Sequence, residues 1–301
     1  TPLYSSAASD VYKRQITDFI KMNTIDVSLA AYLWLCMEHR LSVMVIGGTA
    51  AGKTTLLNVL ASLIRPGSKL VTIEETTELN LPQENWMALS TRASYGLGSE
   101  KMGEVTLFDL VKASLRHRPD MIVVGEVRGE EAYVLFQALA TGHGGMCTMH
   151  AEELDAAIKR LTSPPMNVAP PYIPLMNLAV TVRRVKFYSP EFPAGRIARR
   201  VFHCYEIVDY GKYLPVVTWD PKKDMYTNCF DQSFMLHKIS EASGMTMNKV
   251  LTELDHREAV IEWMVGKGIR DYREVAKVIT EYYGKPGAVY ERTERESKAQ
   301  T

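Results

Sequence analysis

The sequence has no excess of either charge and no apolar run long enough to cross a membrane. Its 35 Lys and Arg residues equal its 35 Asp and Glu residues, so net charge provides no general attraction to nucleic acid or acidic lipid. The longest apolar stretch, VSLAAYLWLCM at residues 27–37, is far shorter than the roughly 20 residues of a spanning helix. We therefore expect no membrane span and no nucleic-acid partner.

Cysteine is scarce, and its spacing excludes two kinds of framework. The four cysteines form no CxxC pair, which argues against a disulfide scaffold and against a tetracysteine zinc site. They are Cys36, Cys147, Cys204 and Cys229. His143 lies near Cys147 and His150, but a strand would turn Cys147 and His150 to opposite faces, and no fourth ligand is evident. The pattern favours a reduced, cytoplasmic location without a zinc site.

An initiator methionine is also absent. Residues 3–15 read LYSSAASDVYKRQ, which looks like the translated adapter of a gene library. We therefore expect residues 1–15 to be a non-native leader and leave them out of the fold. We also expect that a domain which normally precedes residue 16 is missing.

What the sequence does contain is a regular alternation of strand-like and helix-like segments. Apolar, β-branched runs predict strands near residues 41–48, 69–75, 86–92, 121–126, 146–150 and 177–185. Helix-like runs lie between them, and Thr24 is placed to cap another helix that runs to Arg40. The alternation predicts an α/β domain with a mostly parallel central sheet over residues 16–190. The sequence then changes to short β-like segments with turn signals, followed by helix-like runs. This change predicts a small β segment and a C-terminal helical region over residues 191–301.

A glycine-rich loop follows the first of these strands. GGTAAGKTT at residues 47–55 contains the pattern GxxxxGK[ST], in which backbone N–H groups turn toward phosphate oxygens. The lysine of this pattern reaches the terminal phosphates, the hydroxyl binds Mg²⁺, and the following helix presents its positive end. The loop therefore predicts a site for ATP and Mg²⁺. The expected contacts are Gly47, Gly48, Thr49, Ala50, Ala51, Gly52, Lys53, Thr54 and Thr55.

Carboxylates end two of the later strands, where hydrolysis of a nucleotide requires them. Glu126 closes the run MIVVGE and is placed to hold a water bound to Mg²⁺. Glu74 and Glu75 close the run KLVTIEE. Two carboxylates this close raise one pKa unless Mg²⁺ or an arginine compensates. An exposed, polar strand end is the alternative interpretation of each.

Two histidines flank a short strand in TGHGGMCTMHA, residues 141–151. A single histidine is more often a satisfied core residue than a catalytic one. His143 and His150 occur with Thr141 and Thr148 and follow a nucleotide loop. This combination favours sensing of the terminal phosphate or communication between subunits.

Four motifs thus stand in one order: GGTAAGKTT, IEETTELNLPQENW, LRHRPDMIVVGEVRGEEA and TGHGGMCTMHA. This order resembles the secretion ATPase superfamily of type II and type IV secretion, type IV pili and the archaeal flagellum. The residues within these motifs are most similar to those of the archaeal branch, and the resemblance is strong over about residues 24–185. It implies a RecA-like P-loop ATPase in a ring, with a hexamer as the usual form. It also implies a polytopic membrane platform protein as partner, so that the ring is peripheral to the cytoplasmic membrane.

The resemblance implies roles for individual residues. It makes Lys53 and Thr54 ligands of phosphate and Mg²⁺, and it makes Glu126 the Walker B carboxylate. Glu74 falls at the glutamate of the acidic box that orients the attacking water, and Glu75 stands where many relatives have Asp.

Two further groups of residues are implied to act. His143 and His150 fall in the histidine box. Arginines from a neighbouring subunit or from an N-terminal domain complete the site in this superfamily, and surface ion pairs are the alternative for each candidate. The candidates in this chain are Arg92, Arg116 and Arg118.

The expected function is therefore an ATP-hydrolysing motor, and two alternatives stay open. A RecA-like nucleic-acid translocase predicts a basic stripe with aromatics, for which RRVKFY at 183–188 and RIARR at 196–200 are weak support. A nucleotide-binding assembly protein without turnover is the second alternative. The presence of Lys53, Glu74 and Glu126 argues against it.

Overall fold

Unbroken apolar runs form the centre of the fold, because strands of a parallel sheet are buried on both faces. The computed structural model describes residues 14–93, 103–189 and 192–298, so most of the predicted leader lies outside the described residues. The strands are β1 (Val43–Ile46), β2 (Leu70–Glu74), β3 (Trp86–Ser90), β4 (Met121–Val124), β5 (Gly144–Met149), β6 (Leu178–Ser189), β7 (Phe192–Asp209), β8 (Lys212–Asp220) and β9 (Met225–Asn228). Every residue of β1, β2, β4 and β5 is buried.

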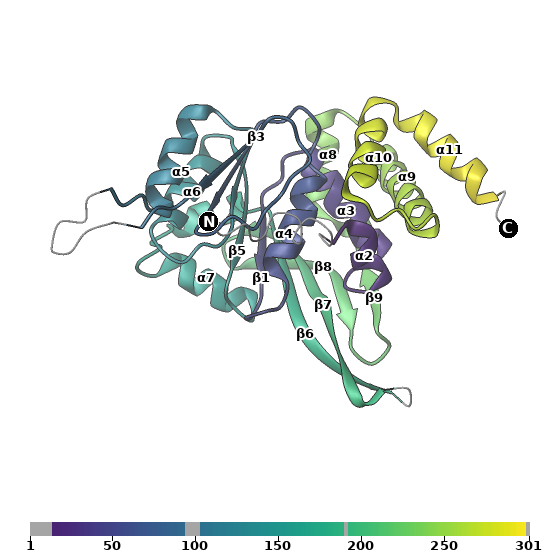
Figure 1. Ribbon diagram of the computed structural model, residues 1–301, viewed down its shortest axis with the longest axis horizontal. Coiled ribbons are helices and arrows are strands. Elements are labelled where there is room, and N and C mark those ends of the chain that lie inside the picture. The colour runs from purple at the N-terminus through teal and green to yellow at the C-terminus, as the bar shows by residue number, and fades with distance from the viewer. Residues whose placement is uncertain (1–13, 94–102, 190–191, 299–301) are drawn as a thin grey trace, which may run out of the picture.

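These strands form one sheet in the order β3-β2-β4-β5-β1-β6-β7-β8-β9 (Figure 1). Neighbours from β3 to β6 pair in parallel, and neighbours from β6 to β9 pair antiparallel. The α/β fold with a mostly parallel sheet is confirmed. The division predicted at residue 190 falls between β6 and β7, which pair with each other. The β segment after that point therefore extends the central sheet.

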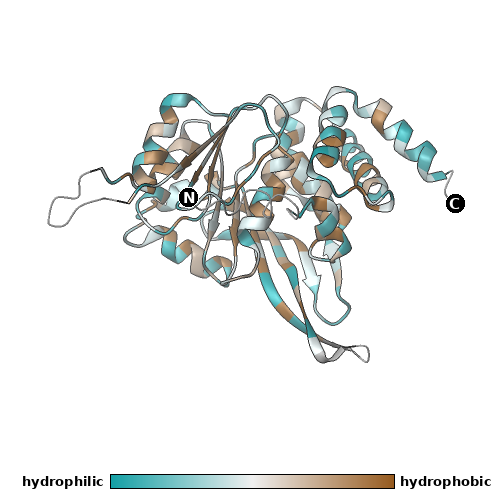
Figure 2. Cartoon of the chain, viewed as in Figure 1, coloured by the Kyte–Doolittle hydropathy of each residue, from teal (hydrophilic) through white to brown (hydrophobic). Residues whose placement is uncertain are grey.

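Helices cover both faces of the sheet. They are α2 (Ile16–Lys21), α3 (Val27–Glu38), α4 (Lys53–Ser62), α5 (Leu107–Ser114), α6 (Glu131–Ala140), α7 (Leu154–Thr162), α8 (Phe234–Ser243), α9 (Met247–Gly266), α10 (Tyr272–Gly284) and α11 (Pro286–Lys298), with short 3-10 turns η2 (Leu115–His117), η3 (Pro170–Leu175) and η4 (Phe230–Gln232). Val43 and Val45 of β1 join the apolar cluster of α3 and α4, whereas Met44 and Ile46 join that of α6 and α7. Figure 2 shows apolar residues along the central strands and hydrophilic residues on the outer helices. None of the described helices is long and apolar enough to cross a bilayer.

The predicted N-cap at Thr24 is wrong. Helix α3 begins at Val27, and the carboxylate of Asp26 accepts the N–H of Leu29 at 2.9 Å. The carbonyl of Thr24 instead accepts the N–H of Val201 at 2.9 Å, so Thr24 belongs to the connection between α2 and the sheet. An ionised carboxylate is a stronger acceptor than a hydroxyl, which favours the start at Asp26.

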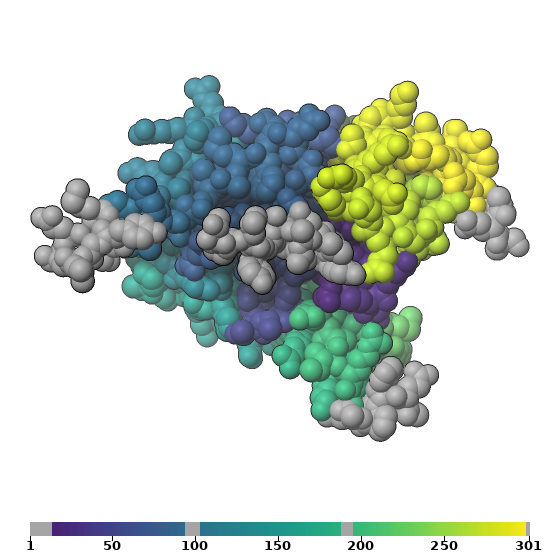
Figure 3. Space-filling view, viewed as in Figure 1, coloured from purple at the N-terminus to yellow at the C-terminus, as the bar shows by residue number. Residues whose placement is uncertain are grey.

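The C-terminal helices pack against the core with apolar side chains and with a few buried polar groups. Arg257 of α9 is 1% exposed, pairs with Glu38 of α3, and lies 4.7 Å from the Trp34 ring. Glu206 of β7 is fully buried and accepts the N–H of Phe234 at 2.7 Å, at the start of α8. In the space-filling view these helices (yellow) adjoin the N-terminal half (purple and blue), while the β6–β7 hairpin (green) stands out at the lower edge (Figure 3).

Candidate active site

Two glycines shape the loop between β1 and α4. Gly47 lies against β6, and an added Cβ there would come within 2.4 Å of the carbonyl oxygen of Val182. Gly52 has a φ of +95°, in the left-handed region that favours glycine, and directly precedes α4. The loop therefore presents the N-terminus of α4 at the carboxyl end of β1, which is the geometry that phosphate binding requires.

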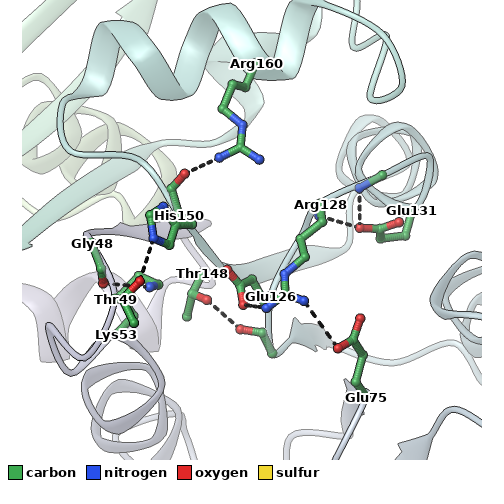
Figure 4. A network of polar contacts seen from close by, with 12 residues as sticks. Gly48, Thr49, Lys53, Glu75, Glu126, Arg128, Glu131, Thr148, His150 and Arg160 are labelled. Carbon is green, nitrogen blue, oxygen red and sulfur yellow. Dashed lines mark hydrogen bonds and ion pairs between the residues drawn. The ribbon is translucent and has the colours of Figure 1, made fainter.

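Lys53 closes this loop on itself. Its Nζ donates a hydrogen bond to the carbonyl of Gly48 at 3.0 Å (Figure 4). Partial burial lowers the pKa of Lys53, while the carboxylate of Glu126 acts in the opposite direction and Arg128 lowers the pKa further. The lysine is thus within the electrostatic field of Glu126 and on the loop where phosphates would bind.

Thr54 shares a pocket with the carboxylates that end the neighbouring strands. The pocket has a volume of about 130 Å³, and Thr54, Glu74, Glu75 and Glu126 are among its lining residues. The carboxylates meet because β2 and β4 pair in parallel, so that their carboxyl ends lie at one edge. Hydroxyl and carboxylate oxygens are ligands that Mg²⁺ prefers, with phosphates completing its shell. In the part of the chain that the structure describes, no group of three or more His, Cys, Asp or Glu residues could hold a metal by itself. This donor set therefore fits an Mg²⁺ ion that arrives with phosphates.

Arg128 lies between two of these carboxylates (Figure 4). Its guanidinium donates to Glu126 across 2.5 Å and to Glu75 across 3.4 Å. Its backbone N–H donates to the carboxylate of Glu131 at 2.6 Å, which fixes the turn between β4 and α6. The hydrogen bond to Glu126 is the main reason that the pKa of Arg128 is raised. This arginine supplies the compensating charge that adjacent carboxylates require.

The two glutamates at the end of β2 have different environments. Glu74 is 4% exposed, and its Oε1 accepts the N–H groups of Glu78 at 3.0 Å and Leu79 at 3.1 Å. The side chain of Glu75 is 59% exposed and faces Arg128. Glu74 thus anchors the chain that follows β2, whereas Glu75 is accessible from solvent.

Strand β5 places the two histidines at its opposite ends. His150 follows the strand, and its Nε2 lies 2.9 Å from Oγ1 of Thr49 in the glycine-rich loop (Figure 4). His143 precedes the strand, and its Nδ1 lies 3.1 Å from Oγ1 of Thr141. Six strand residues span about 20 Å. Within one chain, the structure therefore brings His150 to the candidate site and does not bring His143 there.

The three predicted arginine fingers lie at different edges of the sheet. Arg92 follows β3, at the same edge as Glu126, and its Nε donates to the carbonyl of Gly103 at 2.8 Å. Arg116 and Arg118 precede β4 and lie at the opposite edge. None of the three is among the described residues that line the pocket. Within one chain, the structure therefore does not bring Arg116 and Arg118 to the candidate site.

Two arginines at this site were not predicted. Arg128 has a weak sequence signal, because it stands two residues after Glu126. Arg199 of β7 donates from Nε to the carbonyl of Ala50 at 3.2 Å, across 149 residues of sequence. No local pattern predicts that contact, because it depends on where β7 joins the sheet.

Two known protein families match separate parts of the chain. The type II/IV secretion system protein family matches residues 10–185, and the PilB3-like C-terminal family matches residues 224–299. The chain belongs to the type II/IV secretion ATPase family. The resemblance carried by the four motifs is confirmed, and the C-terminal helices of this secretion ATPase are PilB3-like.

Relatives of this secretion ATPase differ in how much of their length the chain spans. An uncharacterized protein of Methanocaldococcus jannaschii is 40% identical over 272 residues, which are 88% of this chain and 97% of that protein. VirB11 of Agrobacterium fabrum is 38% identical over 136 residues, 45% of this chain and 38% of VirB11. The solved VirB11 ATPase of Brucella suis, in complex with sulphate, has 23% identity and a TM-score of 0.47, and the match covers 68% of this chain and 60% of that one. The similarity to the Methanocaldococcus protein is consistent with the resemblance of the motifs to the archaeal branch.

Proposed function

We propose that this secretion ATPase hydrolyses ATP with Mg²⁺ and that a ring of copies converts the hydrolysis into mechanical work on a membrane platform. One observation carries the proposal: Thr54 shares a pocket with Glu74 and Glu126 beside the glycine-rich loop. A phosphate loop by itself only binds a nucleotide. Carboxylates at the same pocket add the metal-organising and water-positioning groups that hydrolysis needs.

Each residue has a role in this proposal. The N–H groups of the loop and the ammonium of Lys53 bind the phosphates. Mg²⁺ would be held by the hydroxyl of Thr54 and, through a water, by Glu126, and it would neutralise charge that develops on the phosphates. Glu74 orients the attacking water. His150 senses the terminal phosphate through its hydrogen bond with Thr49.

We further propose a homo-oligomer, with a hexamer as the expected form. Arg116 and Arg118 lie at the sheet edge opposite Glu126 in their own chain, so a neighbouring copy is where they can reach an active site. An arginine supplied in this way accelerates other phosphate-loop enzymes by about 10³–10⁵-fold. Family membership also supports a cytoplasmic ring that docks on a polytopic membrane protein.

Part of the positive charge that the nucleic-acid alternative relies on is neutralised. Two arginines of the basic segments are neutralised, because Arg183 pairs with Glu153 and Arg200 pairs with Asp224 at 2.7 Å. A continuous basic stripe is what binding to a nucleic-acid backbone requires. Salt-sensitive DNA binding by the purified chain would nonetheless favour the translocase.

The test is Mg-ATP hydrolysis per mole of chain over a wide range of protein concentration, with Glu126→Gln as control. We expect the specific rate to rise with concentration, because a neighbouring copy completes the site. The Glu126→Gln chain should bind ATP and hydrolyse at background rate. ATP binding without turnover at any concentration, even when an N-terminal domain of this superfamily is added, would contradict the enzyme and support the non-hydrolysing assembly protein.

A further inference from the structure

Two arginines face each other across the β6–β7 hairpin. The antiparallel register places Arg184 of β6 opposite Arg199 of β7, and such side chains share one face of a sheet, with Cβ atoms about 5 Å apart. Like charges in this arrangement are destabilising. The neighbouring arginines, Arg183 of β6 and Arg200 of β7, each form an ion pair with a carboxylate. Neither Arg184 nor Arg199 has one among the residues that the structure describes. Within the described residues, the two positive charges of this pair therefore have no compensating carboxylate.

Arg199 lies on the glycine-rich loop itself. Its Nε donates to the carbonyl of Ala50 at 3.2 Å, and an added Cβ at Gly52 would meet its Cδ at 3.0 Å. Partial burial lowers the pKa of Arg199, and the positive charges of Arg14 and Arg184 lower it further. The guanidinium is therefore held at the rim of the loop, where an anion would relieve the repulsion.

The order of the strands places these arginines and the carboxylates on opposite sides of the loop. Strands β4 and β2, which lead to Glu126 and Glu74, lie on one side of β1, and β6 and β7 lie on the other. The terminal phosphates of a bound nucleotide must face Thr54 and Glu126, because Mg²⁺ bridges those phosphates. The opposite end of the nucleotide then leaves the loop on the side of Arg199.

We propose that Arg199 and Arg184 form a cationic bracket for the nucleoside monophosphate end of ATP and ADP, with the guanidinium of Arg199 on the α-phosphate. This inference rests on the proposed function, because it requires a nucleotide in the loop. A guanidinium suits the site, since its planar donors match phosphate oxygens and its face stacks on a base. The bracket contacts ATP and ADP alike, and so it contributes affinity without sensing the terminal phosphate.

The test is calorimetric binding of ADP, ATP and inorganic pyrophosphate, each with Mg²⁺, to the full chain and to Arg199→Gln and Arg184→Gln. We expect Arg199→Gln to weaken ADP and ATP by the same factor, about tenfold, as for loss of a charge-assisted hydrogen bond. Pyrophosphate has no nucleoside end and should bind as to the wild type. Arg184→Gln should weaken both nucleotides less, and Arg199→Lys should restore part of the loss. Arg65→Gln, an exposed arginine beyond the far end of α4, is the control.

Three results with the Arg199→Gln chain would overturn the bracket. The first is unchanged ADP affinity in Arg199→Gln. The second is loss of ATP affinity alone, which would place Arg199 at the terminal phosphate. The third is equal loss of pyrophosphate and ADP, which would reduce Arg199 to a support for the loop through Ala50. If the wild-type chain binds none of the three ligands, the proposed function and the bracket are both wrong. If the wild type binds them normally and the variants bind them equally well, the bracket alone is wrong. Arg184 is exposed, and its side chain makes no hydrogen bond or ion pair with the described residues. Arg184→Gln should therefore fold, and it can be used for the test if Arg199→Gln does not fold.

Discussion

The guanidinium of Arg128 donates a hydrogen bond to the carboxylate of Glu126 across 2.5 Å. The same guanidinium reaches Glu75 at 3.4 Å, so one cation holds two carboxylates of the candidate site. In the proposed mechanism, an Mg²⁺ ion that organises the phosphates would need the carboxylate of Glu126 as well. Arg128 and the metal would therefore compete for one ligand.

Arg128→Gln should lower the Mg²⁺ concentration that gives half-maximal hydrolysis at saturating ATP. The pair is partly exposed, and exposed ion pairs contribute up to about 1 kcal/mol, which corresponds to a shift of about two- to fivefold. Hydrolysis measured over an Mg²⁺ titration gives the midpoint, and Arg65→Gln serves as the matched control. An Mg²⁺ midpoint equal to that of the wild type would contradict the competition.

Glu74→Ala and Glu75→Ala should separate two functions of adjacent residues. Glu74 accepts two backbone N–H groups in a buried setting, so its loss should cost about 1–3 kcal/mol of unfolding free energy as well as activity. Glu75 is exposed, and its removal should leave the thermal midpoint unchanged. Thermal unfolding and hydrolysis of both variants measure the contrast. Equal destabilisation by the two substitutions would argue against an anchoring role for Glu74.

The contact between Thr49 and His150 should appear as energetic coupling in catalysis. Thr49→Val and His150→Ala each remove one side of the same 2.9 Å hydrogen bond. The double variant should therefore lose less kcat/KM than the sum of the single losses, with a coupling energy of about 0.5–1.5 kcal/mol. Strictly additive losses would show that the two residues act independently.

Asp224 should make part of the stability dependent on pH. Partial burial acts to raise the pKa of Asp224, but hydrogen bonds from Arg200 and Trp219 outweigh it, and the pKa lies below its ordinary value of 3.8. A carboxyl whose pKa is lowered by folding stabilises the protein above its unfolded pKa and loses that contribution as pH falls through the folded pKa. Asp224→Asn should thus lower the thermal midpoint at neutral pH, and the deficit should shrink below about pH 4. A deficit that stays constant from pH 7 to pH 3 would rule out this titration.

Much of the candidate site could be predicted from local pattern. The loop at residues 47–55, the strand end at Glu126 and the acidic pair at the end of β2 each occupy a few consecutive residues, and their chemistry follows from residue type and spacing. Local pattern was not sufficient to predict which histidine lies at the site, because strand β5 places His143 and His150 at its opposite ends. It was not sufficient for Thr24 either, since Asp26 two residues later is the stronger cap.

Local sequence was enough to predict which segments become strands and helices, where the glycine-rich loop lies, and to which family the four motifs point. Those properties depend on periodicity and on residues that are near one another along the chain. Three features depend on how the chain folds in space: β6 to β9 continue the central sheet, Arg128 reaches two carboxylates, and Arg199 donates a hydrogen bond to the carbonyl of Ala50. Strand order and register bring together residues that are distant in sequence. A slip of one residue in the β6–β7 pairing would turn Arg199 to the other face of the sheet, away from the loop.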